Sequence, residues 1–199
     1  MFSVFKVRPG VVALALCAGL ASCQSLNSSR VSVDYYAISG NTTAALDREI
    51  LAKGPRINGG RHAVAVARIR IIPNIRYVNN DNGCQVSRAK VNVDAKVTLP
   101  RWTGRANATK ELGKAWDNID RYTRLHEGVH VAIAFRSASA IEKAVKALPR
   151  YKRCEDLKAQ VRQLINTALE DHDRKQRQFD ADEQKRLAAF ARARREKQS

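Results

Sequence analysis

Alternation of apolar and polar side chains predicts β-strands in the first half of the chain. The segments that show this pattern are 30–38, 62–72 and 84–99. Pro73 interrupts the second segment, so 75–78 is expected to form a bent or edge continuation. A short helix is expected over 44–53, between the first two strands. These segments together predict a small, mostly antiparallel sheet of three or four strands.

Helical spacing of apolar residues dominates the second half of the chain. Residues 107–148 are expected to form one long helix or two stacked ones, which Pro149 terminates. Residues 156–197 are expected to form a second long helix, and apolar positions become sparse after Asp180. The expected class is therefore α+β, with a small sheet followed by two long helices.

The N-terminal residues have the layout of an export signal. Lys6 and Arg8 precede a short apolar stretch over 11–21, which is followed by Ser22 and Cys23. This end resembles a bacterial lipobox, so we expect a signal peptide over 1–22, acylation of Cys23 and a tether over 23–29. These features predict an exported periplasmic lipoprotein that reaches the membrane through Cys23. By resemblance to bacterial lipoproteins, Gln24 after the cysteine favours the outer membrane. An ordinary cleaved signal with an incidental cysteine is the alternative.

Two cysteines, Cys84 and Cys154, remain in the part of the chain expected to fold. Exported compartments are oxidising, so an even pair of cysteines there favours one disulfide. Two free thiols are the alternative. The closed loop would contribute roughly 4 kcal/mol to stability through the lost entropy of the unfolded chain.

The net charge of the 199-residue chain is +17, and it stays strongly positive without Lys6 and Arg8. A basic cytoplasmic protein would suggest a nucleic-acid partner, but export makes that partner unexpected here. Lipopolysaccharide, other anionic lipids or peptidoglycan are the anionic partners of an exported protein. Charge that serves solubility alone is the alternative.

Residues 126–130 read His-Glu-Gly-Val-His, an HExxH motif within the first long helix. At 3.6 residues per turn His126 and His130 lie on one face, where two imidazoles can bind one Zn²⁺ ion. Glu127 is the expected general base, because it can take a proton from a zinc-activated water. A pair of buried histidines, or a metal site without catalysis, is the alternative.

A catalytic zinc site needs a third protein ligand, for which His172 is our first candidate. His172 continues the apolar face of the second long helix. The alternatives are four nearby acidic residues: Glu170, Asp171, Asp173 and Asp180. Asp173 and Asp180 could instead orient a ligating imidazole. We expect His62 to be structural or at the surface, and Tyr122 to serve packing or to donate a hydrogen bond to an oxyanion.

Several of these features together resemble the DUF922 family, described as predicted secreted zinc-dependent proteases. The matching elements, over roughly 30–182, are Tyr35-Tyr36, Gly54-Pro55, Gly83-Cys84, Thr98-Leu99-Pro100-Arg101-Trp102, Trp116, the HExxH motif, Cys154 and Phe179-Asp180. The resemblance implies a zincin-like α+β domain over 30–182, zinc, export and pairing of Cys84 with Cys154. Residues 183–199 remain as a basic helical tail.

The chain departs from the family pattern near its end. The family has His-Gly five residues after the aromatic-Asp pair, and this chain has Lys185-Arg186. If that histidine binds metal in the family, another group must do so here. The resemblance and the motif together predict an envelope-anchored zinc-dependent metallohydrolase, in the first place a peptidase acting on peptides or proteins. A non-catalytic lipoprotein that binds cell wall or lipopolysaccharide, or a peptidoglycan amidase, is the alternative.

Overall fold

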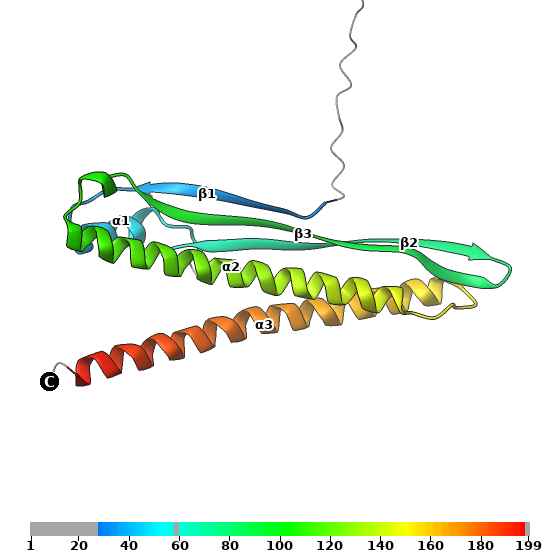
Figure 1. Cartoon of the computed structure of the whole chain (residues 1–199). Coiled ribbons are helices and arrows are strands. Elements are labelled where there is room, and N and C mark those ends of the chain that lie inside the picture. Colours follow the sequence, from blue (N-terminus) through cyan, green and yellow to red (C-terminus); the bar gives the residue numbers. More distant parts are fainter. Residues whose placement is uncertain (1–27, 58–59, 198–199) are drawn as a thin grey trace, which may run out of the picture.

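The computed structural model describes residues 28–57 and 60–197 as three strands and three main helices (Figure 1). The expected signal peptide and Cys23 lie outside the described residues. In chain order the elements are β1 (Arg30–Ile38), α1 (Thr43–Lys53), β2 (Val66–Asn80), β3 (Gly83–Trp102), a 3₁₀ turn (Arg105–Asn107), α2 (Lys110–Lys146) and α3 (Cys154–Glu196). The α+β class is therefore confirmed.

The sheet is mixed, with the strand order β1-β3-β2. Strands β2 and β3 form a long antiparallel hairpin, whereas β1 pairs with β3 in parallel. This parallel pairing differs from the mostly antiparallel sheet that we expected. The physical reason is the connection through α1, which carries the chain from one side of β3 to the other before β2 begins.

Strand β2 continues through Pro73 without an interruption, and residues 75–78 form the edge continuation that was one of the two expected alternatives. Pro73 pairs with Val91 of β3, and β2 lies at the edge of the sheet. Proline is tolerated on an edge strand where its missing N–H would have pointed away from the neighbouring strand. The irregularity falls instead between Arg76 and Tyr77, where the register shifts and brings Cys84 to the core side.

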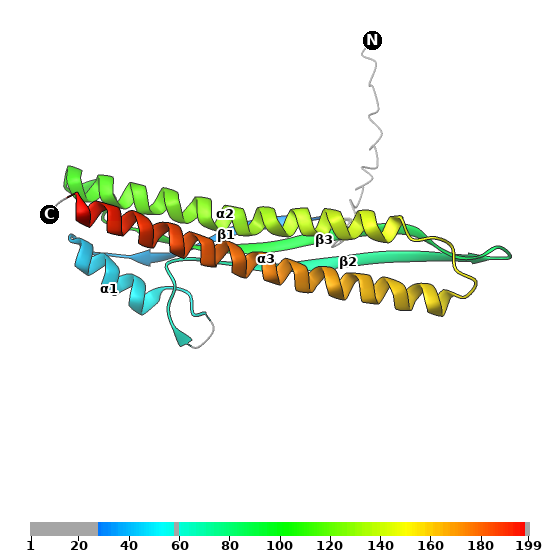
Figure 2. The same ribbon diagram turned by 90° about the horizontal axis from the view of Figure 1, so that it is seen from below.

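The main core lies between the sheet and the two long helices, which both run along the same side of it (Figures 1 and 2). Alternate residues of β3 face this core and are nearly inaccessible to solvent: Ala89, Val91, Val93 and Ala95. Buried side chains of α2 and α3 pack against them: Ala134, Ala138, Ile141, Val145, Leu157 and Val161. The alanines allow α2 to approach the sheet closely.

Helix α2 is one continuous helix, which settles the choice between one helix and two stacked ones. Thr109 caps it by accepting a hydrogen bond from the backbone N–H of Leu112. Near this end the Trp102 and Trp116 rings pack edge to face at 5.8 Å, so the end of β3 is fixed against the first turns of α2. None of the helices in the described part of the chain is long and apolar enough to span a bilayer.

The predicted disulfide between Cys84 and Cys154 is confirmed. It joins the first residues of β3 to the first residue of α3, with a Cα–Cα distance of 5.0 Å. Cys84 also exchanges two backbone hydrogen bonds with Tyr151, each of 2.8 Å. The start of α3 is therefore held against the sheet by both covalent and backbone contacts.

Candidate metal centre

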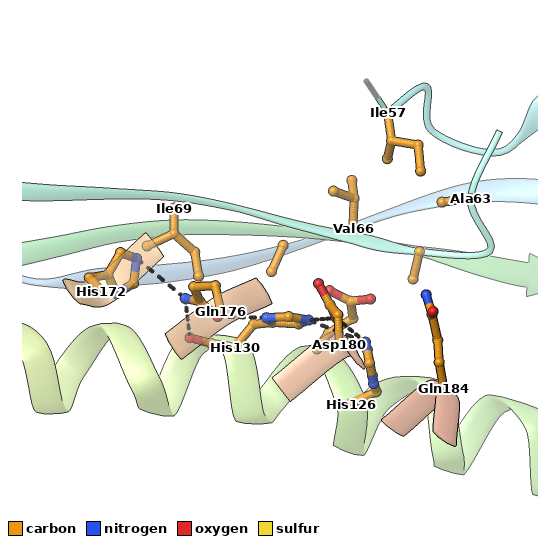
Figure 3. A pocket seen from close by; sticks show the side chains of 13 residues that line it. Ile57, Ala63, Val66, Ile69, His126, His130, His172, Gln176, Asp180 and Gln184 are labelled. Atoms are coloured by element: carbon orange, nitrogen blue, oxygen red, sulfur yellow. Dashed lines mark hydrogen bonds and ion pairs between the residues drawn. The ribbon is translucent and has the colours of Figure 1, made fainter. Parts of the chain in front are cut away.

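The HExxH residues line a cavity of about 590 Å³ between the start of β2 and the two long helices (Figure 3). One wall is small and apolar, and it comes from β2 and the segment before it: Ala63, Ala65, Val66, Ala67 and Ile69. Helix α2 contributes His126, Glu127 and His130 to the opposite wall. Helix α3 adds a row of polar side chains: His172, Gln176, Asp180 and Gln184. The four site residues that the sequence placed first all line this cavity: His126, Glu127, His130 and His172. Tyr122 does not line it.

The helical repeat explains how these side chains reach the cavity. His126 and His130 lie one turn apart on α2, so their rings point to the same side. On α3 the four polar residues follow one another at intervals of four, which places them along one face. Two antiparallel helices thus present two polar faces to a shared space.

Three side-chain atoms converge at the centre of this space. An Oδ1 atom of Asp180 lies 3.0 Å from His130 Nε2 and 3.4 Å from His126 Nε2. The two Nε2 atoms are 3.2 Å apart. A tetrahedral ion with ligands at about 2.0–2.1 Å requires ligand atoms roughly 3.3 Å from one another. The spacing of this group therefore fits a metal ion of that kind.

Gln176 holds the His130 ring in the orientation that a metal ligand needs. Its Oε1 accepts a 2.6 Å hydrogen bond from His130 Nδ1, and its Nε2 donates to the His130 carbonyl oxygen at 3.1 Å. With the proton on Nδ1, the Nε2 lone pair is directed at Asp180 and at the shared space. Sequence reasoning missed Gln176, although its position four residues from both His172 and Asp180 could have indicated it.

The group that the structure assembles contains Asp180 in place of His172, our first candidate for the third ligand. The Nε2 atom of His172 lies 3.3 Å from Gln176 Nε2, and its buried Nδ1 has no hydrogen-bond partner in the described part of the chain. His172 and Asp180 share a helix face but stand about 12 Å apart along the axis. The level at which the His126 and His130 rings meet that face decides between them, and they meet it at Asp180.

Glu127 lies beside the metal group and is only 6% exposed. Burial raises the pKa of its carboxyl group, while positive charge on His130 and a hydrogen bond from the Ala67 backbone N–H act in the opposite direction. Burial also lowers the pKa of His126, and the neighbouring His130 lowers it further. A neutral His126 and a carboxyl group whose pKa is raised suit metal binding and proton transfer.

Aromatic and charged residues enclose the histidine pair. The Phe179 ring lies 4.9 Å from the His126 ring and 5.0 Å from the His130 ring, measured between centroids. The Tyr122 hydroxyl donates a 2.9 Å hydrogen bond to Glu183 on α3. Tyr122 therefore links the two helices, and its proton already has an acceptor.

The remaining sequence candidates lie away from the metal group. His62 Nδ1 is 2.7 Å from the Gly54 carbonyl oxygen, in keeping with the structural role expected for it. Asp171 is paired with Lys175 at 2.6 Å. Lys185, which stands where the family has histidine, is 77% exposed and reaches Asp182 at 3.7 Å. Because Lys185 is not among the cavity residues, its charge does not oppose a cation there.

Comparison with known proteins supports the family resemblance. A family model described as "Bacterial protein of unknown function (DUF922)" matches residues 33–186, which is most of the chain. No curated protein and no solved structure matched in the corresponding searches.

Proposed function

We propose that this chain, which belongs to the DUF922 family, is a metal-dependent hydrolase that cleaves peptides or proteins. The observation that carries the proposal is the convergence of His126, His130 and Asp180 beside the buried carboxyl group of Glu127. Zinc is the metal that we propose, and the cell envelope is the proposed location, with acylated Cys23 as the anchor. The disulfide supports this location, because such bonds persist in oxidising compartments.

The donor set supports zinc. Two imidazole nitrogens and one carboxylate oxygen form a common set of protein ligands in catalytic zinc sites, which leave one position open. The three atoms lie at the wall of the cavity, so the open position would face the space that a substrate can enter. When bound, zinc would polarise a carbonyl group and lower the pKa of a water molecule.

Glu127 is the residue that we propose moves the proton. Its carboxylate is held by the N–H of Ala67. Its raised pKa lets it accept a proton from water and then release it to the leaving amine. Gln176 serves to orient the His130 imidazole, and the Phe179 ring packs against both imidazoles and shields them from bulk water.

A peptide substrate is favoured by the strand that forms the apolar wall. β2 lies at the edge of the described sheet, and edge strands can pair with an extended peptide. The small side chains of Ala63, Ala65 and Ala67 leave room for the side chains of such a segment. The cavity is therefore suited to a stretch of extended polypeptide that passes over the metal group.

Metal content tests the ligand set. We expect about one zinc ion per purified wild-type chain, retention of zinc in His172→Asn, and much weaker binding in Asp180→Asn. His172→Asn is the matched control, because it changes a buried side chain of the same α3 face that does not touch Asp180. Zinc retained by Asp180→Asn and lost by His172→Asn would overturn the proposed ligands.

A Glu127→Gln variant tests the catalytic step. The amide keeps the size of the side chain but cannot accept a proton, so peptide hydrolysis should fall by 100-fold or more while zinc stays bound. Hydrolysis would be followed on unfolded protein and on a mixture of short peptides. Equal activity of the variant and the wild type, with zinc bound in both, would refute the role of Glu127.

A further inference from the structure

The side of the sheet opposite the long helices carries a row of basic residues, which we name the basic face. Their side chains alternate with the core-facing residues of the same strands, and all of them are exposed: Arg30, Arg68, Arg70, Arg76, Arg88, Lys90 and Lys96. Two acidic residues, Asp34 and Asp94, share this face. Seven basic against two acidic residues give these strand positions a net charge of +5, and Glu142 of α2 reaches one of the cations, Lys90, at 3.8 Å.

The strand register places like charges directly opposite each other. Arg68 pairs with Lys96, and Arg76 pairs with Arg88. Asp34 lies 2.6 Å from Lys96 and offsets the first pair, whereas the opposition of Arg76 and Arg88 destabilises the sheet. Within the described part of the chain no acidic side chain forms an ion pair with Arg68, Arg76 or Arg88. An anionic partner would supply the missing counter-charge.

The shape of the basic face indicates what kind of anion fits. From Arg68 to Arg76 the strand extends over about 26 Å, so the cations are spread along a sheet surface and not gathered at one point. A hollow of about 590 Å³ at one part of this face is lined by four of the basic residues and one acidic residue: Arg30, Arg68, Arg70, Lys96 and Asp94. A plane of many phosphate groups matches this distribution better than a single small anion does.

The position of the N-terminal segment favours a membrane surface. The described chain begins at Ser28, and Arg30 opens β1 next to Asp94, at the basic face (Figure 1). Only seven residue steps separate Cys23 from Arg30, a distance of at most about 25 Å. An acylated Cys23 would therefore keep this face within reach of the bilayer surface.

We propose that the basic face binds the phosphate-bearing surface of an anionic lipid bilayer. In this arrangement the sheet faces the lipid headgroups, and α2 and α3 lie on its far side (Figure 1). The proposal rests on the membrane anchor proposed for Cys23, but it is independent of the hydrolytic activity, because none of the basic-face residues lines the metal cavity.

Vesicle binding of the full chain tests the proposal. The probe is a set of phosphatidylcholine vesicles with and without 30% phosphatidylglycerol, and the variant is Arg68→Gln/Arg76→Gln/Arg88→Gln. With roughly a fivefold loss for each cation removed near an anionic surface, we expect about 100-fold weaker partitioning to the anionic vesicles. The N-terminal segment is the same in every variant, so the difference between variants reports on the basic face.

The matched control is Arg136→Gln/Arg177→Gln/Arg194→Gln, which removes the same charge from exposed positions on α2 and α3. Its partitioning should stay within a few fold of the wild type. Equal losses in both triple variants would show that only total charge matters and would overturn the proposal. Tighter binding to a soluble polyanion such as heparin than to the vesicles, at the same salt concentration, would also overturn it.

Thermal unfolding of the same variants distinguishes a loss of vesicle binding from a loss of folded protein. Removing Arg76 and Arg88 relieves a like-charge pair, so the basic-face variant should be at least as stable as the wild type. Weaker vesicle binding by a chain that unfolds at an unchanged or higher temperature supports the proposal. Weaker binding that occurs only together with a lower unfolding temperature would contradict it.

Discussion

Removal of the Cys84–Cys154 disulfide gives a prediction whose magnitude follows from the chain topology. The bond spans a sequence separation of 70 residues. The lost conformational entropy of the unfolded chain for a loop of this length corresponds to about 4.4 kcal/mol at 25 °C. We therefore expect the double variant Cys84→Ala/Cys154→Ala to lower the free energy of unfolding by about 4 kcal/mol.

Reduction of the wild type separates this effect from packing. Cys84 is completely buried, so its replacement by alanine also leaves a small cavity with a cost of its own. Reduced wild-type protein keeps both sulfur atoms and loses only the bond. The two backbone hydrogen bonds between Cys84 and Tyr151 should hold the strand and the start of α3 together in either case.

Denaturant unfolding of three metal-free samples measures the effect: the oxidised wild type, the reduced wild type and the double variant. We expect both samples without the bond to lose about 4 kcal/mol and the double variant to lose slightly more. Losses below about 1 kcal/mol in both would refute the loop-entropy argument. A large loss in the double variant alone would assign the stabilisation to packing.

Three further predictions concern the site and the core. Gln176→Leu removes the acceptor for the N–H of His130 and should weaken zinc binding about 10–100-fold. Gln176→Glu keeps an acceptor, so in a competition titration it should bind zinc more tightly than the leucine variant does. Arg186 holds the pKa of Glu183 at about 2, so the stability that this carboxylate contributes is complete above about pH 4.5 and is lost as the pH falls towards 2. The difference in unfolding temperature between metal-free wild type and Glu183→Gln should shrink over that range, and a constant difference would contradict the assignment. Leu157→Ala leaves a cavity at a fully buried position and should lower the free energy of unfolding by about 2–5 kcal/mol, measured with denaturant, without changing the zinc content. A loss below about 1 kcal/mol would argue against this core.

The local pattern of the sequence determined the elements and half of the site. Alternation located all three strands, and the helical repeat together with Pro149 located α2 and α3 to within a few residues. The spacing of His126 and His130 required both rings to lie on one face of a helix. The even pair of cysteines was enough to predict the disulfide, because only two cysteines were expected to fold.

The strand pairing was decided by tertiary structure. The apolar and polar residues of β1 alternate in the same way whether the neighbouring strand is parallel or antiparallel. The alternation therefore could not predict the parallel pairing of β1 with β3. Pro73 left a bent and an edge continuation as alternatives, and only the strand order shows that its strand lies at the edge of the sheet. The basic face is hidden for the same reason, since the opposition of Arg76 and Arg88 depends on the register of two strands.

The third member of the metal group also required the packed helices. Helical spacing places His172, Gln176 and Asp180 on one face of α3 and does not distinguish which of them reaches the metal group. It does not say which turn of α3 lies level with the two histidines of α2. One turn corresponds to about 5.4 Å, which is more than the error in ligand position that a metal site accepts. Periodicity therefore determines the direction in which a side chain points, and only the contact between elements distant in sequence determines which side chains meet.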